Sequence, residues 1–505
     1  MNYYTLKSHN HNYYIYSGYR QLFLLSNPAL NKVIEYFRQG REPNDIIKHG
    51  LECENSSFEF EEFEREELMY NIGFFYYLKE NDFFKQKVER LEGKITPLMI
   101  KNELANISRI VFEITNACNL DCFYCAYGNL YDDYEDRNNS NISFEKSKVL
   151  LNYIFNLHRS NKNISTCSKL EIGFYGGEPF LNLNFMKKII EYINKNKPDF
   201  LDVIYSTTTN GTLLEKNMDF IVTNNFRVWV SIDGDLSNNE FRVYKKNKKE
   251  TFSKVHDNIL SLKNKYPEYF KDKVDFQAVL HSKNTPIEIY EFIKSNYDKA
   301  PIIAELSKVG LKNSCIKCFN AIYKDKEKEF SKITKQSILN DLFSTLPNVK
   351  KLSETIEKLT PFVVNYMELT KERTKQYIPT GTCIPFSIEL FMTVSGKILP
   401  CEHIGQQFSL ATVTSNKIEI DYNDIALKYE TWFSQIKMLC RKCERKSICT
   451  KCIFKLIGKD NKINMCDDFM DFKKFKCFLE EQISVMENNP EFYHKITSEV
   501  VKKNI

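Results

Sequence analysis

The chain has 505 residues, of which 42% are hydrophobic and 27% are charged, and this length suits about three globular domains. Its net charge is only +5, with 71 Lys and Arg residues interspersed among 66 Asp and Glu residues, which argues against a nucleic-acid partner. The sequence shows neither a long apolar window nor a basic segment followed by an apolar one, so we expect no membrane association and a cytoplasmic location.

The 15 cysteines are the most informative feature of the composition. In a reducing cytoplasm, cysteines bind metal or do redox chemistry more often than they form disulfides. Most of them are clustered, in residues 118–125 and 383–477. The isolated Cys53 and Cys167 are expected to be packing residues.

Residues 1–100 contain no clustered cysteine and predict a small α+β domain. The segment NYYIYSGYRQLFLLS predicts a hairpin of short strands with a turn at Ser17 and Gly18. The segment NPALNKVIEYF predicts an amphipathic helix, and EREELMYNIGFFYYL predicts a helix that runs into a final strand.

From about residue 107, apolar strands alternate with amphipathic helices. The six expected strands lie in RIVFEIT, LEIGFY, DVIYSTTT, RVWVSID, DFQAVLH and IIAELS. This alternation predicts a parallel sheet with helices outside, as a full or partial α/β barrel. Enzymes with such barrels place their chemistry on loops at the carboxyl ends of the strands. A charged helical stretch, residues 321–375, follows the barrel.

The motif CNLDCFYC places Cys118, Cys122 and Cys125 in one loop directly after the first barrel strand. Three thiolates can hold three irons of a cubane cluster and leave the fourth iron open, and an open metal position is typical of catalytic sites. The alternatives are a zinc knuckle or cysteines that pack as small apolar residues. The location at the carboxyl end of a barrel strand favours the catalytic interpretation.

With this spacing, the loop resembles the Cys-x3-Cys-x-aromatic-Cys signature of the radical S-adenosylmethionine (SAM) superfamily, and the resemblance spans about residues 107–310. It implies an α/β fold with a partial (β/α)6 TIM-like barrel, and a 4Fe–4S cluster held by Cys118, Cys122 and Cys125. In this family the open iron chelates SAM, whose reductive cleavage gives a 5′-deoxyadenosyl radical that abstracts hydrogen from the substrate.

Three further motifs, YGGEP, TTNGT and SIDG, stand at the ends of the next three strands. Each alone could be an ordinary turn, but glycines also permit close approach of a ligand. By resemblance, the residues that contact SAM are Tyr124, Gly176, Gly177, Glu178, Asn210, Ser231 and Arg242. Tyr124 would lie beside the adenine, and Ser231 and Arg242 would hold the ribose and the carboxylate. The alternatives are a Tyr124 that packs in the barrel and an Arg242 at the surface.

The second cysteine region begins with Cys-x12-Gly-x4-Cys and continues with Cys-x2-Cys-x5-Cys-x2-Cys. Such repeated pairs indicate metal, but zinc and iron–sulfur sites share the pattern. The region resembles the SPASM extension of radical SAM enzymes, which carries two auxiliary 4Fe–4S clusters. It departs from that pattern at Thr450 and Lys451, where SPASM sequences have three residues.

The SPASM resemblance implies a distal cluster held by Cys440, Cys443, Cys449 and Cys466, and a proximal cluster held by Cys383, Cys401 and Cys452. The fourth proximal ligand stays open. Cys315 or Cys318 could supply it, or an open iron could bind a substrate thiolate, and Cys477 is left over.

Glu402 directly follows Cys401. In sulfatase-maturing relatives an aspartate at this position is the proposed proton acceptor, so the resemblance implies that Glu402 is a catalytic base. The alternative for Glu402, and for His403, is a solvated side chain beside a cluster.

The resemblance implies four domains: a leader-peptide-recognition domain (1–100), a radical SAM barrel (101–315), a helical bridging region (316–372) and a SPASM domain (373–505). The first resembles the winged-helix element with which peptide maturases capture a leader as an added strand, although a structural cap is the alternative.

The expected function is that of an enzyme that makes a thioether or carbon–carbon cross-link in a ribosomally made precursor peptide (a RiPP), with reduced flavodoxin or ferredoxin as electron donor. Two alternatives stay open: a sulfatase-type maturase that makes formylglycine, and a non-catalytic zinc or iron–sulfur scaffold.

Overall fold

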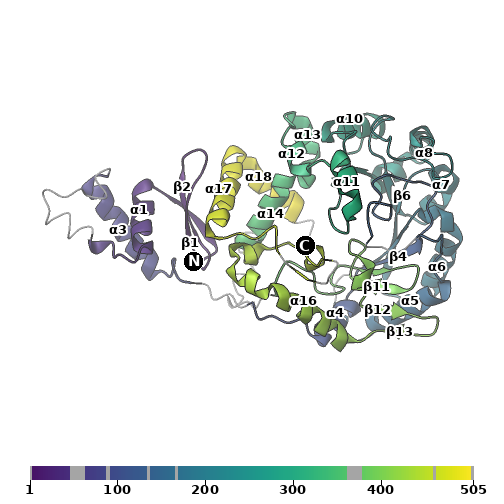
Figure 1. Cartoon of the computed structure of the whole chain (residues 1–505), viewed down its shortest axis with the longest axis horizontal. Helices are drawn as coiled ribbons and strands as arrows, with labels where there is room; N and C mark the ends of the chain where they lie inside the picture. The colour runs from purple at the N-terminus through teal and green to yellow at the C-terminus, as the bar shows by residue number, and fades with distance from the viewer. Residues whose placement is uncertain are drawn as a thin grey trace.

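The computed structural model describes residues 3–45, 63–86, 91–132, 137–164, 169–360, 378–458, 462–463 and 465–501. A three-stranded sheet belongs to the N-terminal part, and a ten-stranded sheet lies in the larger part at the other end of the molecule (Figure 1). Cys53 and Cys167 fall outside the described residues. In the described segments, no helix has the length and hydropathy needed to cross a membrane.

The N-terminal sheet is an antiparallel meander of β1 (Tyr3–Lys7), β2 (Tyr13–Ser17) and β3 (Leu22–Ser26). Helix α1 (Pro28–Arg38) follows at once, because the Asn27 side chain accepts a hydrogen bond from the Leu30 N–H and a proline suits the first turn.

Helix α3 (Arg65–Glu80) corrects one expectation, since the segment that should end as a strand is helical throughout. Leu68, Ile72, Phe75 and Leu78 recur at helical spacing and bury their side chains in one core with α1. The aromatic run in residues 74–77 favours a strand locally, but this tertiary contact decides the outcome.

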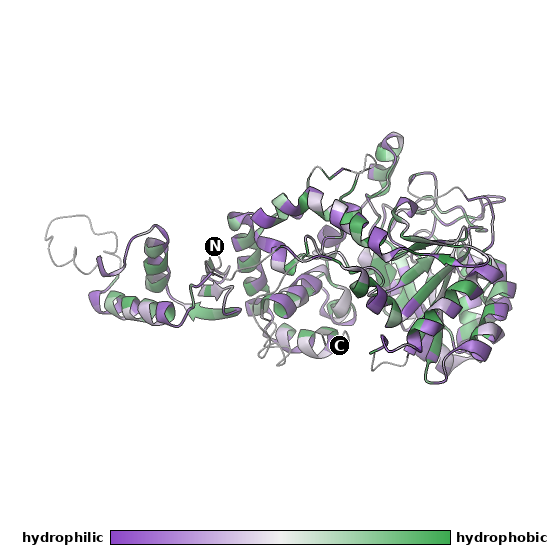
Figure 2. Cartoon of the chain, turned by 90° about the horizontal axis from the view of Figure 1, so that it is seen from below, coloured by the Kyte–Doolittle hydropathy of each residue, from purple (hydrophilic) through white to green (hydrophobic). Residues whose placement is uncertain are grey.

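The large sheet contains the predicted barrel. Six parallel strands pair in chain order: β4 (Arg109–Thr115), β5 (Lys169–Gly176), β6 (Asp202–Thr209), β7 (Arg227–Ser231), β8 (Val274–Val279) and β9 (Ile302–Ala304). The connecting helices are α5 (Phe144–His158), α6 (Leu183–Asn196), α7 (Leu214–Thr223), α8 (Phe252–Lys265), α9 (Pro267–Lys273) and α10 (Pro286–Tyr297), and α4 (Pro97–Ala105) precedes β4. Figure 2 shows apolar strands inside helices that carry hydrophilic residues on their outer faces. The predicted partial barrel is therefore confirmed.

The second cysteine region extends the same sheet. Strand β10 (Leu390–Met392) pairs in parallel with β4, and β11 (Lys397–Leu399), β12 (Ala411–Val413) and β13 (Ile418–Glu419) add on in antiparallel order. Side chains of this region and of the barrel share one hydrophobic core. The two cysteine regions therefore belong to one packed body.

Helices complete the C-terminal half. They are α11 (Ile316–Ile322), α12 (Lys326–Phe330), α13 (Gln336–Asp341), α14 (Pro347–Leu359), α16 (Tyr422–Lys442), α17 (Phe472–Asn488) and α18 (Pro490–Lys495). Short 3-10 turns are η1 (Pro179–Asn182), η2 (Asn313–Cys315), η3 (Phe343–Thr345), η5 (Gln406–Phe408), η6 (Glu444–Ile448) and η7 (Ile453–Lys455), and the π-helical turn η8 (Ile496–Val501) follows α18.

The N-terminal sheet packs against these C-terminal helices. Tyr4 and Leu6 of β1 lie in one core with Phe475 and Leu479 of α17. The Lys7 N–H, at the end of β1, donates to a Glu480 carboxylate oxygen at 3.0 Å. Helix α17 therefore covers the β1 side of the sheet, and β3 is the outer strand on the other side.

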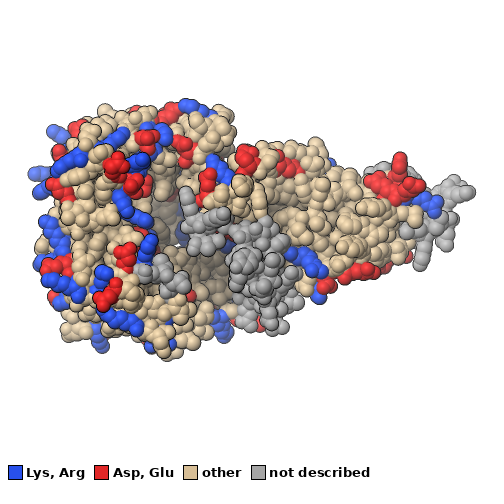
Figure 3. Space-filling model, turned by 180° about the vertical axis from the view of Figure 1, so that it is seen from behind, with Lys and Arg blue, Asp and Glu red and all other residues tan. Residues whose placement is uncertain are grey.

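Charged side chains of both signs are interspersed over the face seen in Figure 3, in keeping with the small net charge. The same view shows a hollow between the barrel half and the part that leads to the N-terminal domain.

Candidate active site at the carboxyl edge of the barrel

Cys118, Cys122 and Cys125 lie on the loop after β4 and line a cavity of about 480 Å³. This volume falls within the range of about 300–1,000 Å³ that is usual for small-molecule sites. The cavity is also lined by three basic residues, Arg137, Lys245 and Lys312. The site therefore combines thiols with positive charge at the edge of the sheet where barrel enzymes work.

The three thiols influence one another. Burial, together with Cys125 and Cys118, raises the pKa of Cys122 to about 12, and burial also raises the pKa of Cys118. Three thiolates this close repel one another, and the positive charge of bound iron would offset that repulsion. Among the described residues, no three His, Cys, Asp or Glu side chains are arranged around one metal ion. In a cubane each thiolate binds its own iron, so this donor set fits a cluster.

The YGGEP motif holds the start of the cysteine loop. The Gly177 N–H donates to the Thr115 carbonyl at 2.8 Å, and the Glu178 N–H donates to the Ala117 carbonyl at 2.9 Å. A Cβ on Gly177 would lie 1.9 Å from the Ala117 oxygen, and Gly176 has a φ of +135°. Glycine is required at both positions because β5 approaches the loop so closely.

We therefore expect Gly177→Ala to displace the loop and to lower the iron bound there by most of one cubane, about four irons per chain. Iron analysis and electron paramagnetic resonance (EPR) of the anaerobic protein measure this loss. Gly73→Ala is the control, because a Cβ on Gly73 of α3 meets nothing within 4 Å. Unchanged iron and EPR signals in Gly177→Ala would contradict the expectation.

Glu178 is fully buried and joins the ends of β5 and β6. Its carboxylate accepts hydrogen bonds from the Thr209 hydroxyl at 2.8 Å, the Asn210 N–H at 2.8 Å and the Phe180 N–H at 3.2 Å. Burial raises the pKa of Glu178 to about 7, although these donors oppose the shift. The side chain that the sequence assigns to SAM is therefore engaged in holding two strand ends together.

Asn210 connects the end of β6 to the cysteine loop. Its side-chain NH2 donates to the side-chain oxygen Oδ1 of Asn119 at 2.9 Å and to the Cys118 sulfur at 3.9 Å. The Thr212 hydroxyl donates to the side-chain oxygen Oδ1 of Asn210 at 2.6 Å and accepts from the side-chain NH2 of Asn119 at 2.8 Å. Asn210 is thus placed beside a predicted cluster ligand.

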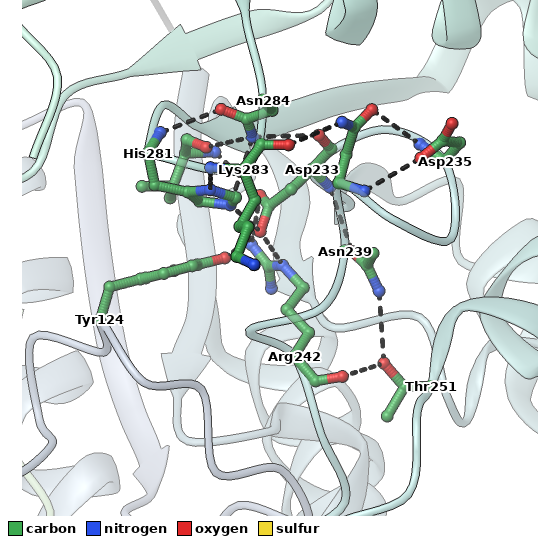
Figure 4. Close-up of polar contacts among 11 residues, drawn as sticks. Tyr124, Asp233, Asp235, Asn239, Arg242, Thr251, His281, Lys283 and Asn284 are labelled. Atoms are coloured by element: carbon green, nitrogen blue, oxygen red, sulfur yellow. Dashed lines mark hydrogen bonds and ion pairs between the residues drawn. The ribbon is translucent and has the colours of Figure 1, made fainter. Parts of the chain in front are cut away.

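Asp233, in the SIDG motif after β7, is a central residue that the sequence interpretation missed. The Arg242 guanidinium donates two hydrogen bonds to the Asp233 carboxylate, from Nε at 2.9 Å and from Nη2 at 3.2 Å. The Val279 N–H donates to the same carboxylate at 2.9 Å. The Tyr124 hydroxyl donates to the same carboxylate, and the His281 Nε2 lies 3.5 Å from it. Figure 4 shows these side chains converging on Asp233.

This buried network brings together two residues predicted for SAM. The Arg242 guanidinium lies 5.6 Å from the centre of the Tyr124 ring, and both side chains are buried. Burial alone would raise the pKa of Asp233, but the charge of Arg242 and the hydrogen bonds of His281 and Arg242 hold it well below its usual range. Arg242 is therefore not a surface charge, and Asp233 fixes its position. Ser231, two residues before Asp233, accepts a hydrogen bond from the Gln277 side chain at 3.0 Å.

The second cysteine region forms two groups. In the distal group, burial together with the other thiols raises the pKa of Cys440 to about 11. The Met470 N–H donates to the Cys443 sulfur at 3.5 Å. The members of the distal group are Cys440, Cys443, Cys449 and Cys466.

The proximal group contains Cys383, Cys401 and Cys452. The Ile453 N–H donates to the Thr382 hydroxyl at 2.8 Å, which joins the backbone beside Cys452 to that beside Cys383. Burial raises the pKa of Cys401 to about 12, and Cys452 contributes to the shift.

Cys315 contacts the first cysteine region, and none of its described contacts is with the proximal group. Its thiol donates to the Asn129 carbonyl at 3.6 Å, and it packs in an apolar cluster with Tyr124 and Leu130 of the first cysteine loop. Cys318 and Cys477 are exposed. The structure therefore gives no support to Cys315 or Cys318 as the fourth proximal ligand.

Glu402 lies in a buried carboxylate pair with Glu389. The Glu402 N–H donates to Glu389 at 3.3 Å, and Arg109 donates to the other Glu389 oxygen at 2.9 Å. Burial and the neighbouring Glu402 raise the pKa of Glu389. Arg109 is the first residue of β4, and through Glu389 it places Glu402 at the amino end of that strand. The cysteine loop follows the carboxyl end of β4, so Glu402 and the loop lie at opposite ends of the strand. His403 is 75% exposed.

Comparison with known proteins identifies the barrel. Residues 112–294 match the Radical SAM superfamily. Uncharacterized protein MJ0907 of Methanocaldococcus jannaschii is 26% identical over 62% of this chain and 92% of that protein. A cysteine-type anaerobic sulfatase-maturating enzyme of Clostridium novyi is 28% identical over 38% of this chain and 49% of the enzyme. The radical SAM cyclopropyl synthase TigE of Paramaledivibacter caminithermalis is 27% identical over 40% of this chain and 41% of the synthase.

The matches to the two named enzymes thus span less than half of their length. A solved structure of native anSMEcpe with bound AdoMet superposes with a TM-score of 0.50 at 21% identity, and covers 78% of this chain and 100% of that one. At this identity the likeness shows a shared fold. Together, the cysteine loop at the carboxyl edge of the barrel and the superfamily match show that residues 112–294 are a radical SAM domain and that the chain is a radical SAM enzyme.

Proposed function

We propose that this chain is a radical SAM/SPASM maturase that forms a thioether or carbon–carbon cross-link in a ribosomally made precursor peptide. One observation carries the proposal: the barrel that bears the SAM-type cysteine loop shares one hydrophobic core with a region that holds two further groups of cysteines, most of them partly buried. An iron–sulfur cluster and SAM, when bound, would supply radical chemistry, namely hydrogen abstraction from the peptide.

The chain's own residues then bind and orient the cofactors. Cys118, Cys122 and Cys125 hold the first 4Fe–4S cluster, and Asn210 supports Cys118 from β6. Arg242 would hold the SAM carboxylate with the part of its guanidinium that does not donate to Asp233, which takes Nε and Nη2. Its buried position excludes water from that contact.

The distal and proximal groups hold two auxiliary 4Fe–4S clusters. The distal group offers four thiols, which suits a complete cluster, and the proximal group offers three, which leaves one iron for a substrate thiolate. Reduced flavodoxin or ferredoxin donates the electrons, and the enzyme acts in the cytoplasm.

The precursor's leader binds as an added strand on β3. The amide of Lys7 on the β1 side already donates to α17, whereas β3 pairs with β2 on one side and exposes 72% of Leu25. An outer strand of this kind can pair with an extended peptide through main-chain hydrogen bonds.

The test of the proposed function uses the anaerobic, reduced enzyme with SAM and the short peptides encoded beside its gene. We expect one peptide to lose the mass of two hydrogens and to gain a cross-link that fragmentation mass spectrometry locates. If the enzyme cleaves SAM while every candidate peptide keeps its mass, the proposed substrate class is wrong.

A sulfatase-type maturase is the second candidate, supported by the relatives named as anaerobic sulfatase-maturating enzymes and by Glu402 beside Cys401. It would convert a Cys or Ser to formylglycine. The Cys reaction exchanges sulfur for oxygen and so differs in mass from a cross-link, whereas the Ser reaction removes the same two hydrogens and is recognised by its aldehyde and by fragmentation that shows no cross-link. Glu402→Gln should then abolish turnover. The position of Glu402 at the amino end of β4 favours the cross-linking enzyme, for which this variant should retain activity.

A further inference from the structure

Tyr429 of α16 has a buried hydroxyl that forms no hydrogen bond with any described residue. Its side chain is 0% exposed. The ring packs edge-on against Trp432, Phe433 and Phe454, with centroids 5.3, 5.8 and 5.7 Å away. The phenol is therefore fixed in an aromatic core with its polar atom unsatisfied.

An unsatisfied buried hydroxyl destabilises a fold, because the group has lost its hydrogen bonds to water without gaining another partner. Phenylalanine would fill the same aromatic core without that cost. Buried polar groups nearly always have a partner, so a tyrosine here indicates a partner other than the described protein atoms.

Two of the proximal cysteines, Cys401 and Cys452, pack against the hydrophobic core that contains Tyr429. Burial raises the pKa of Tyr429 well above its usual value. The negative charges of Cys452, Cys401 and Cys383 raise it further. Phe454, which contacts the Tyr429 ring, stands two residues after Cys452. The Tyr429 side chain thus packs beside the turn that begins after Cys452, and Cys401 and Cys452 border the same hydrophobic core.

We propose that the Tyr429 hydroxyl donates a hydrogen bond to a sulfur of the proximal cluster and thereby raises its reduction potential. The inference rests on the auxiliary clusters of the proposed function. Cluster sulfurs carry negative charge and are better acceptors than neutral thiols. Reduction adds a further negative charge, so a donor stabilises the reduced form more than the oxidised form. Tyr429 is a positioning and tuning residue that contacts no substrate.

The test compares Tyr429→Phe with its parent in a chain that carries Cys118→Ala, Cys122→Ala and Cys125→Ala. This background removes the first cluster and leaves the two auxiliary clusters, about eight irons per chain. A redox titration followed by EPR then gives two midpoint potentials. We expect one to fall by a tenfold change in the reduction equilibrium, which is about 59 mV for one electron, while the other stays constant.

Tyr297→Phe is the matched control, since Tyr297 is also buried but its hydroxyl pairs with His256 at 2.7 Å in the barrel wall. It should change neither potential. A loss of about four irons per chain in Tyr429→Phe, but not in Tyr297→Phe, would also place the hydroxyl at a cluster. If the parent retains eight irons and Tyr429→Phe leaves both potentials unchanged, the inference is wrong and the proposed function stands. If the parent retains no iron, the auxiliary clusters are wrong and the inference falls with them.

Discussion

Cys122→Ala abolishes SAM cleavage, and Cys440→Ala retains part of it: this is the expected result with the largest effect. Cys122 is one of three thiols around the active-site cavity, and two thiolates cannot hold a cubane with a single open iron. Cys440 belongs to the distal group, which under the proposed function holds an auxiliary cluster and not the cluster that binds SAM. The measurement is 5′-deoxyadenosine released after dithionite reduction, which should fall to the level without enzyme for Cys122→Ala.

The exposed Cys477 on α17 provides the control. Cys477→Ala should keep full iron content and full cleavage, while Cys122→Ala and Cys440→Ala each lose about four irons. Equal and complete loss of cleavage in both variants, together with loss of all iron, would show that the clusters only hold the fold together.

The barrel was predictable because apolar strand-forming runs alternate regularly with amphipathic helices from about residue 107. Runs such as RIVFEIT and RVWVSID have few alternatives once amphipathic helices separate them. The end of α3 was not predictable from its own residues, since its aromatic side chains suit a strand and only contact with α1 settles the helix.

The candidate site was predictable where its residues lie in one loop. Cys118, Cys122 and Cys125 are neighbours in sequence, so their spacing carries the signal. Asp233 was not predicted as a site residue, because its partner Tyr124 is 109 residues away in the sequence. The signal that could have identified it is an aspartate directly after the apolar run VWVSI. The location of Glu402 was not predicted either, because it depends on the pairing of β10 with β4.

Asp233→Asn should weaken both the fold and SAM binding. The substitution keeps the size of the side chain but leaves the buried Arg242 guanidinium without its counter-charge, which typically costs about 3–5 kcal/mol. The released guanidinium no longer holds the position from which it would bind the SAM carboxylate, so we expect SAM affinity to fall by at least tenfold, about 1.4 kcal/mol. Denaturant unfolding and SAM titration of the reconstituted enzyme measure the two effects.

Asp235→Asn in the same loop is the matched control. The Asp235 carboxylate accepts hydrogen bonds from the Ser237 hydroxyl and the Asn238 backbone N–H of its own loop, so this substitution should change SAM affinity little. A double-mutant cycle with Arg242→Met then separates the causes. If Asp233 acts by pairing with Arg242, adding Asp233→Asn to Arg242→Met should cost less stability, and less affinity, than adding it to the parent. Additive losses would contradict this, because they would mean that Asp233 supports the site through Tyr124 and Val279 and not through the arginine.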